Sequence, residues 1–569
     1  MPVKDEVLVG KVLIEKGIIS LEQLEMGLAE QKKCGGLICA ILVKLGFASQ
    51  EKIFEILAEQ LGVAYIELKD KHIDPLVIGK VPAKFASHYK IIPIEFENQT
   101  ITIAMANPLD IRTIDDIRLL VGLEVKAALS SEPEIEEAIR KYYGVGADTL
   151  EKIIAEKPSG RIIEEKAGIE DVAAFAQDAS IVKFVNQILS EAVKDRATDI
   201  HIEPFQDELR VRFRIDGVLY NINIPEAIKH FHHAIVSRIK VMAQMNIAER
   251  RLPQDGRIKI KIKEEELDLR ISTIPTTFGE AVHMRILGSK LFLDLESLGL
   301  LDKDLKIMEE MIKKPHGIVF VTGPTGSGKS TTLYAALSHI NSENVKIITI
   351  EDPVEYQLKG VNQIQIFPKI GLTFATALRH MLRHDPDAMM VGEVRDYETA
   401  EIAIRAALTG HLVFSTLHTN DAAGAVTRLL DMGIEPFLVS SSLECLIAQR
   451  LVRVICPSCK CKLDEHKRKA ITGQIGNSEI IKKDVQLYEG KGCAECRFTG
   501  YKGRTAIYEI LVMTESIREM VLKRGSAQAI KQKAISCGMH TLRQDGLRKV
   551  WQGVTTFAEV FRVTQKDGA

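Results

Sequence analysis

The stretch Gly323-Pro-Thr-Gly-Ser-Gly-Lys-Ser-Thr331 decides the fold of this chain. It fits the phosphate-binding loop pattern G-x-x-x-x-G-K-[ST]. An apolar segment, residues 317–322, precedes the loop, and a helix-like run, residues 331–340, follows it. Such a loop aims backbone N–H groups at phosphate oxygens, at the positive end of a helix. The sequence therefore predicts a site for ATP or GTP.

The prediction of nucleotide binding covers every residue of this loop. Lys329 is predicted to reach the β- and γ-phosphates, and Ser330 to hold Mg²⁺. A glycine-rich turn with a chance lysine is the alternative, but the flanking strand and helix argue against it. The predicted nucleotide-binding residues are Gly323, Pro324, Thr325, Gly326, Ser327, Gly328, Lys329, Ser330 and Thr331.

Polar side chains follow three further apolar segments, each a predicted strand. Glu351, Asp352 and Glu355 follow the first segment, Glu393 follows the second, and His418 follows the third. In open α/β sheets the ligand lies at the carboxyl ends of the strands, so we expect these side chains beside the phosphate loop. An ATPase needs carboxylates for Mg²⁺ and the attacking water, and a polar sensor of the γ-phosphate. The structural alternatives are a helix cap for Glu393, ion pairs for Asp352 and Glu355, and a satisfied hydrogen bond for His418.

A separate predicted strand, residues 209–216, alternates sharply between apolar and charged side chains. Arg210, Arg212 and Arg214 share one face of it. Three like charges on one face repel each other unless something anionic meets them. An arginine supplied from another domain or subunit stabilises the charge that forms on a γ-phosphate during transfer. The alternative is a solvated strand face with surface ion pairs.

Nine cysteines occur in the chain, and five of them lie between Cys456 and Cys496. Cys456-Pro-Ser-Cys459 and Cys493-Ala-Glu-Cys496 are two C-x-x-C pairs. Two such pairs suit a tetrahedral, structural Zn²⁺ with four thiolate ligands. Cys461 is an alternative ligand, and free buried cysteines are the alternative to a metal site.

The first sixty residues contain an internal repeat. Each copy is predicted to form a helix, a glycine stop and a second helix, and its leucines are expected to form the core of the module. Gly10, Leu13, Gly17, Leu24, Leu28 and Gln31 recur twenty-nine positions later as Cys39, Leu42, Gly46, Ile53, Leu57 and Gln60.

At 569 residues the chain is too long for one core. We predict an amino-terminal repeat domain (1–145), a linker (146–176), a second α/β domain that supplies arginines (177–300), an ATPase core (301–445) and a helical carboxyl-terminal domain with the cysteine site (446–569). The net charge of −2 argues against nucleic acid as the main partner. We find no signal peptide and no apolar run of about 18 residues, so we expect a cytoplasmic protein with at most a peripheral membrane role.

Together these motifs resemble the secretion-ATPase superfamily that powers type II secretion and type IV pilus assembly. The shared blocks are residues 323–331, an acidic box at 350–355, residues 387–396, a histidine box at 410–418, and the strands around 199–204, 212–217 and 253–257. The resemblance covers essentially the whole chain. It implies an α/β multidomain protein with a RecA-like phosphate-loop core, an α+β second domain, a zinc-binding insertion and an α-rich amino-terminal domain.

The resemblance also implies roles for the candidate residues. Lys329 and Ser330 serve phosphate and Mg²⁺, and Glu393 is the catalytic glutamate. Glu351, Asp352 and Glu355 surround the metal and water, and His418, with His411 as a second candidate, senses the γ-phosphate. Arg212, then Arg214, then Arg257 are the arginines expected to act on a neighbouring subunit. Gly392 stands where other phosphate-loop enzymes carry aspartate, as in this family, which places more weight on the acidic box.

Members of the family form rings, typically hexamers, and act on an inner-membrane platform protein to add pilin or pseudopilin to a filament. The amino-terminal repeat is similar to a domain that binds cyclic di-GMP in some members. Here Leu8 replaces the usual arginine and Cys39 replaces a glycine, and both changes weaken that expectation. A docking module for a membrane partner is the alternative.

The resulting prediction is a cytoplasmic, hexameric ATPase that drives type IV pilus assembly, with the type II secretion ATPase as the alternative. The cysteine pairs favour assembly over retraction, because retraction ATPases of pilus systems generally lack them. A nucleic-acid motor would need a basic chain with exposed aromatics, and this chain has a charge of −2 and 5% aromatic residues. A scaffold that binds ATP without turnover is disfavoured by Glu393.

Overall fold

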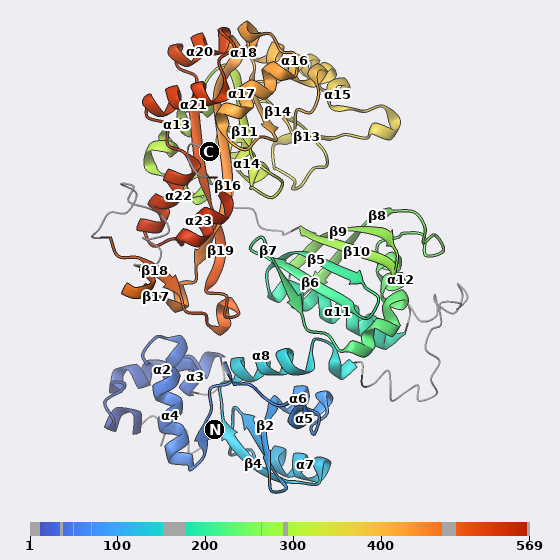
Figure 1. Cartoon of the computed structure of the whole chain (residues 1–569), viewed down its shortest axis with the longest axis vertical. Helices are drawn as coiled ribbons and strands as arrows, with labels where there is room; N and C mark the ends of the chain where they lie inside the picture. Colours follow the sequence, from blue (N-terminus) through green and yellow to red (C-terminus); the bar gives the residue numbers. More distant parts are fainter. Residues whose placement is uncertain are drawn as a thin grey trace. The chain divides into compact units, whose positions relative to one another are not determined.

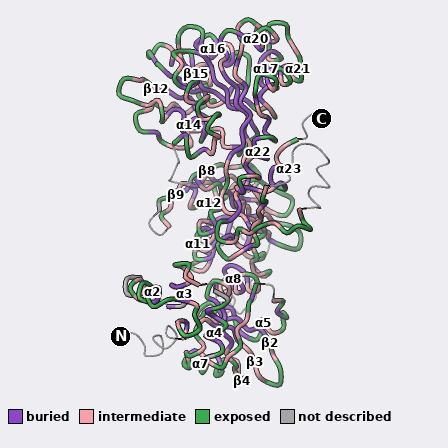
Figure 2. The backbone as a smooth tube through the Cα atoms, turned by 90° about the vertical axis from the view of Figure 1, so that its left-hand side faces the viewer, coloured by how far each residue is buried: buried purple, intermediate pink, exposed green. Residues whose placement is uncertain are grey.

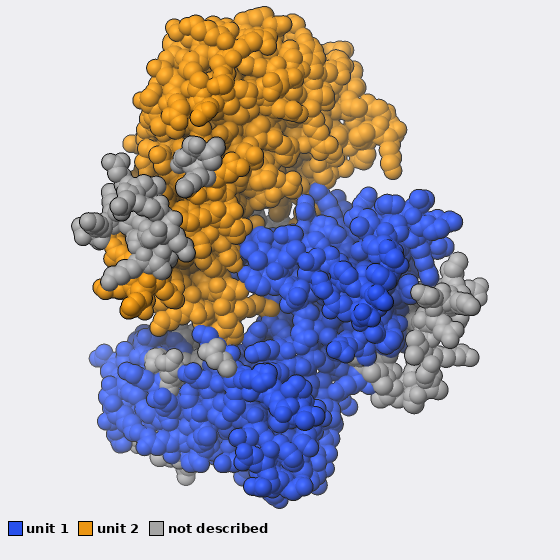
Figure 3. All heavy atoms as spheres, viewed as in Figure 1, with its two compact units in different colours: residues 1–286 blue, residues 287–569 orange. Residues whose placement is uncertain are grey.

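The computed structural model describes residues 12–34, 38–48, 50–69, 71–149, 151, 178–262, 265–287, 294–468 and 485–565. The chain divides into two compact units, residues 1–286 and 287–569 (Figure 3). Most of the predicted linker, residues 152–176, lies outside the described residues. None of the described helices combines the length and the apolar character needed to cross a membrane.

The internal repeat forms a small helical core at the start of the first unit. Gly17 and Gly46, at equivalent positions of the two copies, both adopt left-handed backbone, with φ of 72° and 74°. Leu13 and Leu42, also equivalent, are fully buried. The predicted sequence of helix, glycine stop and helix therefore occurs twice. Gly10 and the side chains of Cys39 and Gln60 lie outside the described part. The helices are α2 (Leu21–Cys34), α3 (Ile38–Lys44) and α4 (Gln50–Leu61).

A four-stranded sheet of order β1-β4-β3-β2 follows the repeat. The predicted hairpin is present as the antiparallel pair β2 and β3, and Asn98 and Gln99 at its turn both have positive φ. β4 pairs in parallel with β3 and β1, which the sequence did not predict. The elements are β1 (Ala64–Tyr65), α5 (Pro75–Ile78), α6 (Ala83–Tyr89), β2 (Ile91–Glu97), β3 (Thr100–Met105), α7 (Ile111–Val121), β4 (Glu124–Leu129) and α8 (Glu132–Tyr143).

The rest of the first unit is a six-stranded sheet of order β7-β6-β5-β10-β9-β8 with two helices. Alternation along β6 buries Leu209, Val211 and Phe213 on one face, as predicted. The elements are α11 (Ala179–Lys194), β5 (Ala197–Pro204), β6 (Leu209–Ile215), β7 (Val218–Ile222), η1 (Glu226–Phe231), α12 (His232–Met242), β8 (Gln254–Ile262), β9 (Glu265–Thr276) and β10 (Gly279–Leu287).

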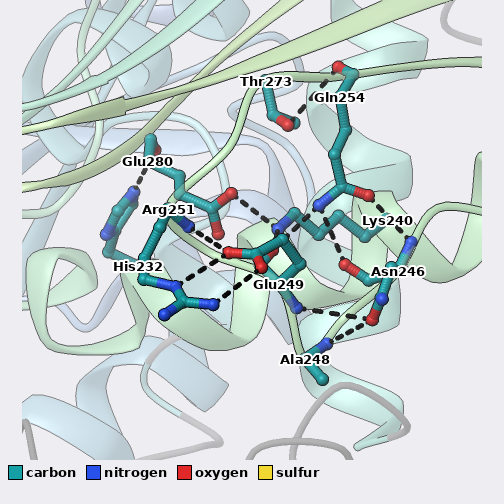
Figure 4. A network of polar contacts seen from close by, with 9 residues as sticks. All are labelled: His232, Lys240, Asn246, Ala248, Glu249, Arg251, Gln254, Thr273 and Glu280. Carbon is teal, nitrogen blue, oxygen red and sulfur yellow. Dashed lines mark hydrogen bonds and ion pairs between the residues drawn. The ribbon is translucent and has the colours of Figure 1, made fainter.

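A buried ammonium group holds the loop between α12 and β8 (Figure 4). Lys240 is 1% exposed, and its Nζ lies 2.6 Å from Oε1 of Glu280 on β10. The same Nζ donates to the carbonyl oxygen of Glu249 at 2.7 Å, and Nε2 of Gln254 donates to that oxygen at 2.8 Å. A buried charge requires such partners, so this network fixes the chain just before the strand that carries Arg257.

The second unit is built on a seven-stranded sheet of order β13-β12-β14-β15-β11-β16-β19 (Figure 1). All neighbours pair in parallel except β16 and β19, which are antiparallel. Several strands are buried along their whole length (Figure 2), as expected for a sheet with helices on both faces. The elements up to α18 are η2 (Leu295–Leu298), α13 (Asp302–Ile312), β11 (Gly317–Thr322), α14 (Lys329–Ile340), β12 (Ile347–Glu351), β13 (Val361–Gln365), η3 (Pro368–Ile370), α15 (Phe374–Met381), η4 (Leu382–His384), β14 (Ala388–Val391), α16 (Tyr397–Leu408), β15 (Leu412–Leu417), α17 (Ala422–Asp431) and α18 (Pro436–Ser442).

Residues 446–569, predicted as a helical domain, also contribute two long strands to this sheet. The predicted boundary at residue 445 falls inside β16, which pairs with β11. The expected fold class is nevertheless confirmed: an α/β multidomain chain with a RecA-like core, an α+β second module, a cysteine-bearing insertion and a helix-rich amino-terminal module. The remaining elements are β16 (Leu443–Ile455), η5 (Pro457–Cys459), β17 (Lys460–Lys462), β18 (Tyr488–Gly490), η6 (Ala494–Cys496), β19 (Tyr501–Val512), α20 (Glu515–Leu522), α21 (Ala527–Ser536), α22 (Leu542–Trp551) and α23 (Phe557–Val563).

Candidate active site

The phosphate loop connects β11 to α14 and packs directly against β16. A Cβ atom at Gly323 would lie 2.6 Å from the carbonyl oxygen of Gln449, and one at Gly328 would lie 2.8 Å from Nε2 of the same residue. Gly328 also has a left-handed φ of 87°. Both positions therefore require glycine, and the backbone of the loop can curl around a phosphate as the motif predicts.

Lys329 is the first residue of α14, and its side chain turns back over the loop. Its Nζ donates to the carbonyl oxygens of Gly323 at 2.8 Å and Pro324 at 3.2 Å. Burial lowers the pKa of Lys329 to about 8; the nearby carboxylate of Glu393 opposes this shift and the cation of Arg450 adds to it. A partly desolvated ammonium beside a turn of N–H groups is suited to bind phosphate.

Two further loop hydroxyls fit a bound nucleotide. Ser330, the predicted Mg²⁺ ligand, is exposed on the first turn of α14. The hydroxyl oxygen of Ser327 is buried and has no hydrogen-bond partner among the described residues. A buried polar atom of this kind calls for an outside partner, and a phosphate oxygen in the loop would supply one.

Glu393 and His418 lie together at the carboxyl ends of β14 and β15. Oε2 of Glu393 is 3.4 Å from Nε2 of His418, and its Oε1 is 2.5 Å from Nη2 of Arg395. The Glu393 carboxylate also acts on the pKa of Lys329. The structure thus brings Glu393, His418 and Lys329 to one place, as the sequence predicted. It also adds Arg395, which stands two residues after the glutamate and was not among the predicted site residues.

His411, the second candidate for a phosphate sensor, lies elsewhere. It precedes the first residue of β15, so it is at the amino end of the strand that carries His418 at its carboxyl end. Its Nδ1 is 3.1 Å from the carbonyl oxygen of Ala406 at the end of α16. The structure therefore does not group His411 with the phosphate loop.

The acidic box separates into a buried and an accessible part. Glu351 is 4% exposed and accepts hydrogen bonds from the hydroxyl groups of Tyr334 and Thr349 and from the amide of Gln363. Burial and this carboxylate hold the pKa of Tyr334 above its usual range. Asp352 is exposed and Glu355 is half-buried. Glu351 on β12 thus joins α14 to β13 through Tyr334 and Gln363.

Gly392 has a structural explanation. Its N–H donates to the carbonyl oxygen of Ile350 at 2.7 Å, and a Cβ atom at this position would lie 3.1 Å from that oxygen. The backbones of β12 and β14 are therefore close at this point, and a side chain in place of Gly392 would crowd β12.

The predicted arginine face belongs to the first unit, and each arginine has carboxylate neighbours in its own module. Arg212 makes two hydrogen bonds of 2.7 Å with Glu203, and Arg257 donates to Asp268 at 2.6 Å. Arg214 donates to the carbonyl oxygen of Gly217 at 3.2 Å and lies 3.8 Å from Asp199. The anions that meet this face are therefore carboxylates of its own module, as in the alternative interpretation of surface ion pairs.

Several basic side chains surround Asp199 at the centre of the same sheet. It accepts hydrogen bonds from His283 at 3.0 Å and Arg285 at 2.9 Å. Burial opposes its ionisation, but these hydrogen bonds hold the pKa of Asp199 well below its usual range. The carboxylate is thus a fixed negative charge around which the basic side chains of β6 and β10 are arranged.

The four predicted zinc ligands form one cluster. Their sulfur atoms all lie within 4.8 Å of one another, and Cys456–Cys493, Cys459–Cys496 and Cys493–Cys496 are each 3.8 Å apart. Four thiolates about 2.3 Å from a tetrahedral Zn²⁺ would be separated by about 3.8 Å, so the donor set fits this ion. Cys461, the alternative ligand, lies outside the cluster and donates to the carbonyl oxygen of Glu489 at 3.5 Å.

A mostly parallel sheet with a phosphate loop on one strand and a glutamate at the end of another defines a RecA-like ATPase. The family model for "Type II/IV secretion system protein" matches residues 174–562, and the chain belongs to this family. The MshEN domain model matches residues 61–149. The chain is therefore an ATP-hydrolysing enzyme of the type II/IV secretion family, and its cofactors include nucleotide and Mg²⁺.

Two relatives resemble the chain over nearly its full length. The type IV pilus assembly ATPase PilB of Myxococcus xanthus is 46% identical over 98% of this chain and 99% of its own. The type II secretion system protein E of Xanthomonas campestris pv. campestris is 42% identical over 94% of each. Among solved structures, the Legionella pneumophila ATPase DotB has the same fold, with a TM-score of 0.50 and 22% identity over 67% of this chain and 95% of that one.

Proposed function

We propose that ATP hydrolysis by this chain drives type IV pilus assembly. The observation that carries the proposal is the full-length similarity to a pilus assembly ATPase, which spans both chains almost end to end. A loop lysine, a carboxylate and a histidine lie together at the ends of the strands, which supports a nucleotide site there. Type II secretion is the second candidate, supported by the 42% identity to a type II secretion protein E.

In the proposed reaction Lys329 binds the β- and γ-phosphates and Ser330 holds Mg²⁺, which neutralises charge on the phosphates. Glu393 orients the attacking water and accepts its proton. Arg395, whose Nη2 lies 2.5 Å from Oε1 of Glu393, holds this carboxylate in place. His418, beside Glu393, detects the γ-phosphate. Asp352 and Glu355 hold water around the metal, and Glu351 positions the acidic box through Tyr334 of α14.

A ring of six subunits would complete the site with arginines from a neighbouring copy. Arg212, Arg214 and Arg257 are the candidates. Any of them must exchange its present partner for a γ-phosphate during turnover. Of the three, Arg214 makes the weakest contacts in its own module, because it has one carbonyl acceptor and a carboxylate 3.8 Å away. Closure and opening around ATP would then rotate the modules and move a partner, for which we propose an inner-membrane platform protein.

The remaining modules support this motor. We propose that Cys456, Cys459, Cys493 and Cys496 hold a structural Zn²⁺. We propose that the amino-terminal module docks on the membrane machinery at the cytoplasmic face of the inner membrane, or binds cyclic di-GMP. The MshEN match to residues 61–149 supports such a regulatory or docking role. Nucleic acid is not a proposed partner, in keeping with the net charge of −2.

The test is to replace the gene in its own bacterium with a Glu393→Gln variant, then count surface pili and assay secreted proteins. Cells without pili and with normal secretion would support the pilus assembly function. Piliated cells that retain secretion substrates would make the chain a type II secretion motor. Normal pili together with normal secretion would contradict both candidate functions.

A further inference from the structure

The residue just before the phosphate loop contacts the residue just after His418. Thr322 ends β11 and is fully buried. Its Oγ1 accepts the N–H of Thr419 at 2.9 Å and lies 2.7 Å from the Thr419 hydroxyl oxygen. The Thr419 hydroxyl donates in turn to the carbonyl oxygen of Asp421 at 2.9 Å. A single side chain therefore joins the start of the loop to the turn that carries the histidine.

Arg450 on β16 holds the same turn from its other side. Its Nη2 donates to the backbone carbonyl oxygen of Asn420 at 2.9 Å and to the side-chain oxygen of Asn420 at 3.3 Å. Its Nη1 would be 3.1 Å from a Cβ atom at Gly323, so the guanidinium also lies beneath the loop. Burial lowers the pKa of Arg450. Residues 419 and 420 are thus anchored to two neighbouring strands, β11 and β16.

The neighbouring strand end shows the same kind of contact for Glu393. The Thr416 hydroxyl donates to the carbonyl oxygen of Gly392 at 2.7 Å, and the N–H of Val394 donates to the carbonyl oxygen of Thr416 at 3.1 Å. The turns at the ends of β14 and β15 are therefore cross-linked to each other. The Thr322 and Arg450 contacts add to the backbone pairing of β11 with β15, in which Thr322 lies opposite Leu417.

We propose that Thr322 is a positioning residue for ATP hydrolysis, acting through Thr419 to hold His418 in register with the phosphate loop, with Arg450 as its support. The inference rests on the proposed role of His418. When a γ-phosphate fills the loop, a shift of the loop is carried directly to the histidine turn by the Thr322 hydroxyl. Catalytic geometry is sensitive to displacements of about 1 Å, so loss of this contact should affect turnover more than nucleotide binding.

The test uses the purified full-length chain with Mg²⁺ and ATP, measuring kcat and KM by phosphate release and Kd with fluorescently labelled ADP. The variants are Thr322→Val, Thr322→Ser, His418→Ala and the double variant Thr322→Val/His418→Ala. Ser415→Ala is the matched control, because Ser415 is a fully buried hydroxyl on β15 that donates to Val391 at 2.7 Å, away from the loop. Thermal melting shows whether each variant is folded. If Thr322→Val does not fold, Thr419→Val replaces it.

We expect Thr322→Val to lower kcat about tenfold, which corresponds to a free energy within the range measured for coupling between contacting residues. Its Kd should stay within about threefold of the wild-type value. Thr322→Ser and Ser415→Ala should stay near wild type, and the effect of Thr322→Val should vanish in the His418→Ala background. Three results would overturn the inference while the role of His418 stands. They are an unchanged kcat in Thr322→Val, a low kcat in Thr322→Ser, and a fall in kcat on adding Thr322→Val to His418→Ala that equals the fall in the wild type. Full activity of His418→Ala would overturn that role and the inference together.

Discussion

The pH dependence of nucleotide capture follows from the surroundings of Lys329. Burial lowers the pKa of this ammonium from 10.5 to about 8. Only the charged form attracts phosphate, so kcat/KM for ATP should fall as the pH rises through this value. At pH 7 about nine-tenths of free enzyme carries the charge and at pH 9 about one-tenth does, which predicts a roughly tenfold loss between the two.

The assay is steady-state phosphate release at low ATP between pH 7 and pH 9.5, because kcat/KM reports the groups of the free enzyme. Near-ultraviolet circular dichroism at each pH shows that the chain stays folded. Lys329→Arg is the control: its guanidinium does not titrate in this range, so its residual kcat/KM should be flat. A flat wild-type profile up to pH 9.5 would refute the reasoning, since it would mean that the ammonium keeps an ordinary pKa.

Three further perturbations test other parts of the structure. Removal of metal with a chelator, or the substitution Cys493→Ser, should release one zinc per chain and lower the melting temperature of the second unit. Metal analysis that finds no zinc in the native protein would contradict the proposed zinc site. Lys240→Met should lower the free energy of unfolding by about 3–5 kcal/mol, because it leaves the Glu280 carboxylate buried without its partner. The rate of hydrogen exchange in α12, measured in the full chain, should rise. Replacing Lys240 and Glu280 together by apolar residues should restore most of the protection from exchange. Gly323→Ala should weaken ATP binding by at least about fivefold, in line with backbone strain of about 1–3 kcal/mol. Unchanged binding of labelled ADP would contradict the close approach of β16.

The parts of the site that the sequence predicted are those specified by local motifs. A glycine-rich loop between a strand and a helix, and polar residues directly after apolar strands, require only the rule that ligands bind at the carboxyl ends of parallel strands. Glu393, His418 and Lys329 meet in the structure for this reason. The two C-x-x-C pairs were predictable in the same way, and only geometry could separate Cys461 from the four clustered cysteines.

The missed parts depend on pairing between distant segments. β16 and β19 pair across the cysteine segment, residues 456–500, and no local pattern shows that either strand belongs to the central sheet. Arg450 was missed with them, since its place beneath the phosphate loop comes only from the β11–β16 pairing. The carboxylate partners of the arginine face were open to prediction, because Asp199 and Glu203 alternate along residues 199–204 with the same period of two.

The most direct test of the central claim is Mg²⁺-dependent phosphate release by the purified full-length chain and by its Glu393→Gln variant, with nucleotide binding measured alongside. We predict ATP hydrolysis by the wild type, a loss of about 10²–10⁴-fold in kcat in the variant, as expected when a general base is removed, and little change in nucleotide affinity. A wild-type chain that binds ATP without releasing phosphate, or a Glu393→Gln variant that turns over at the wild-type rate, would contradict the account.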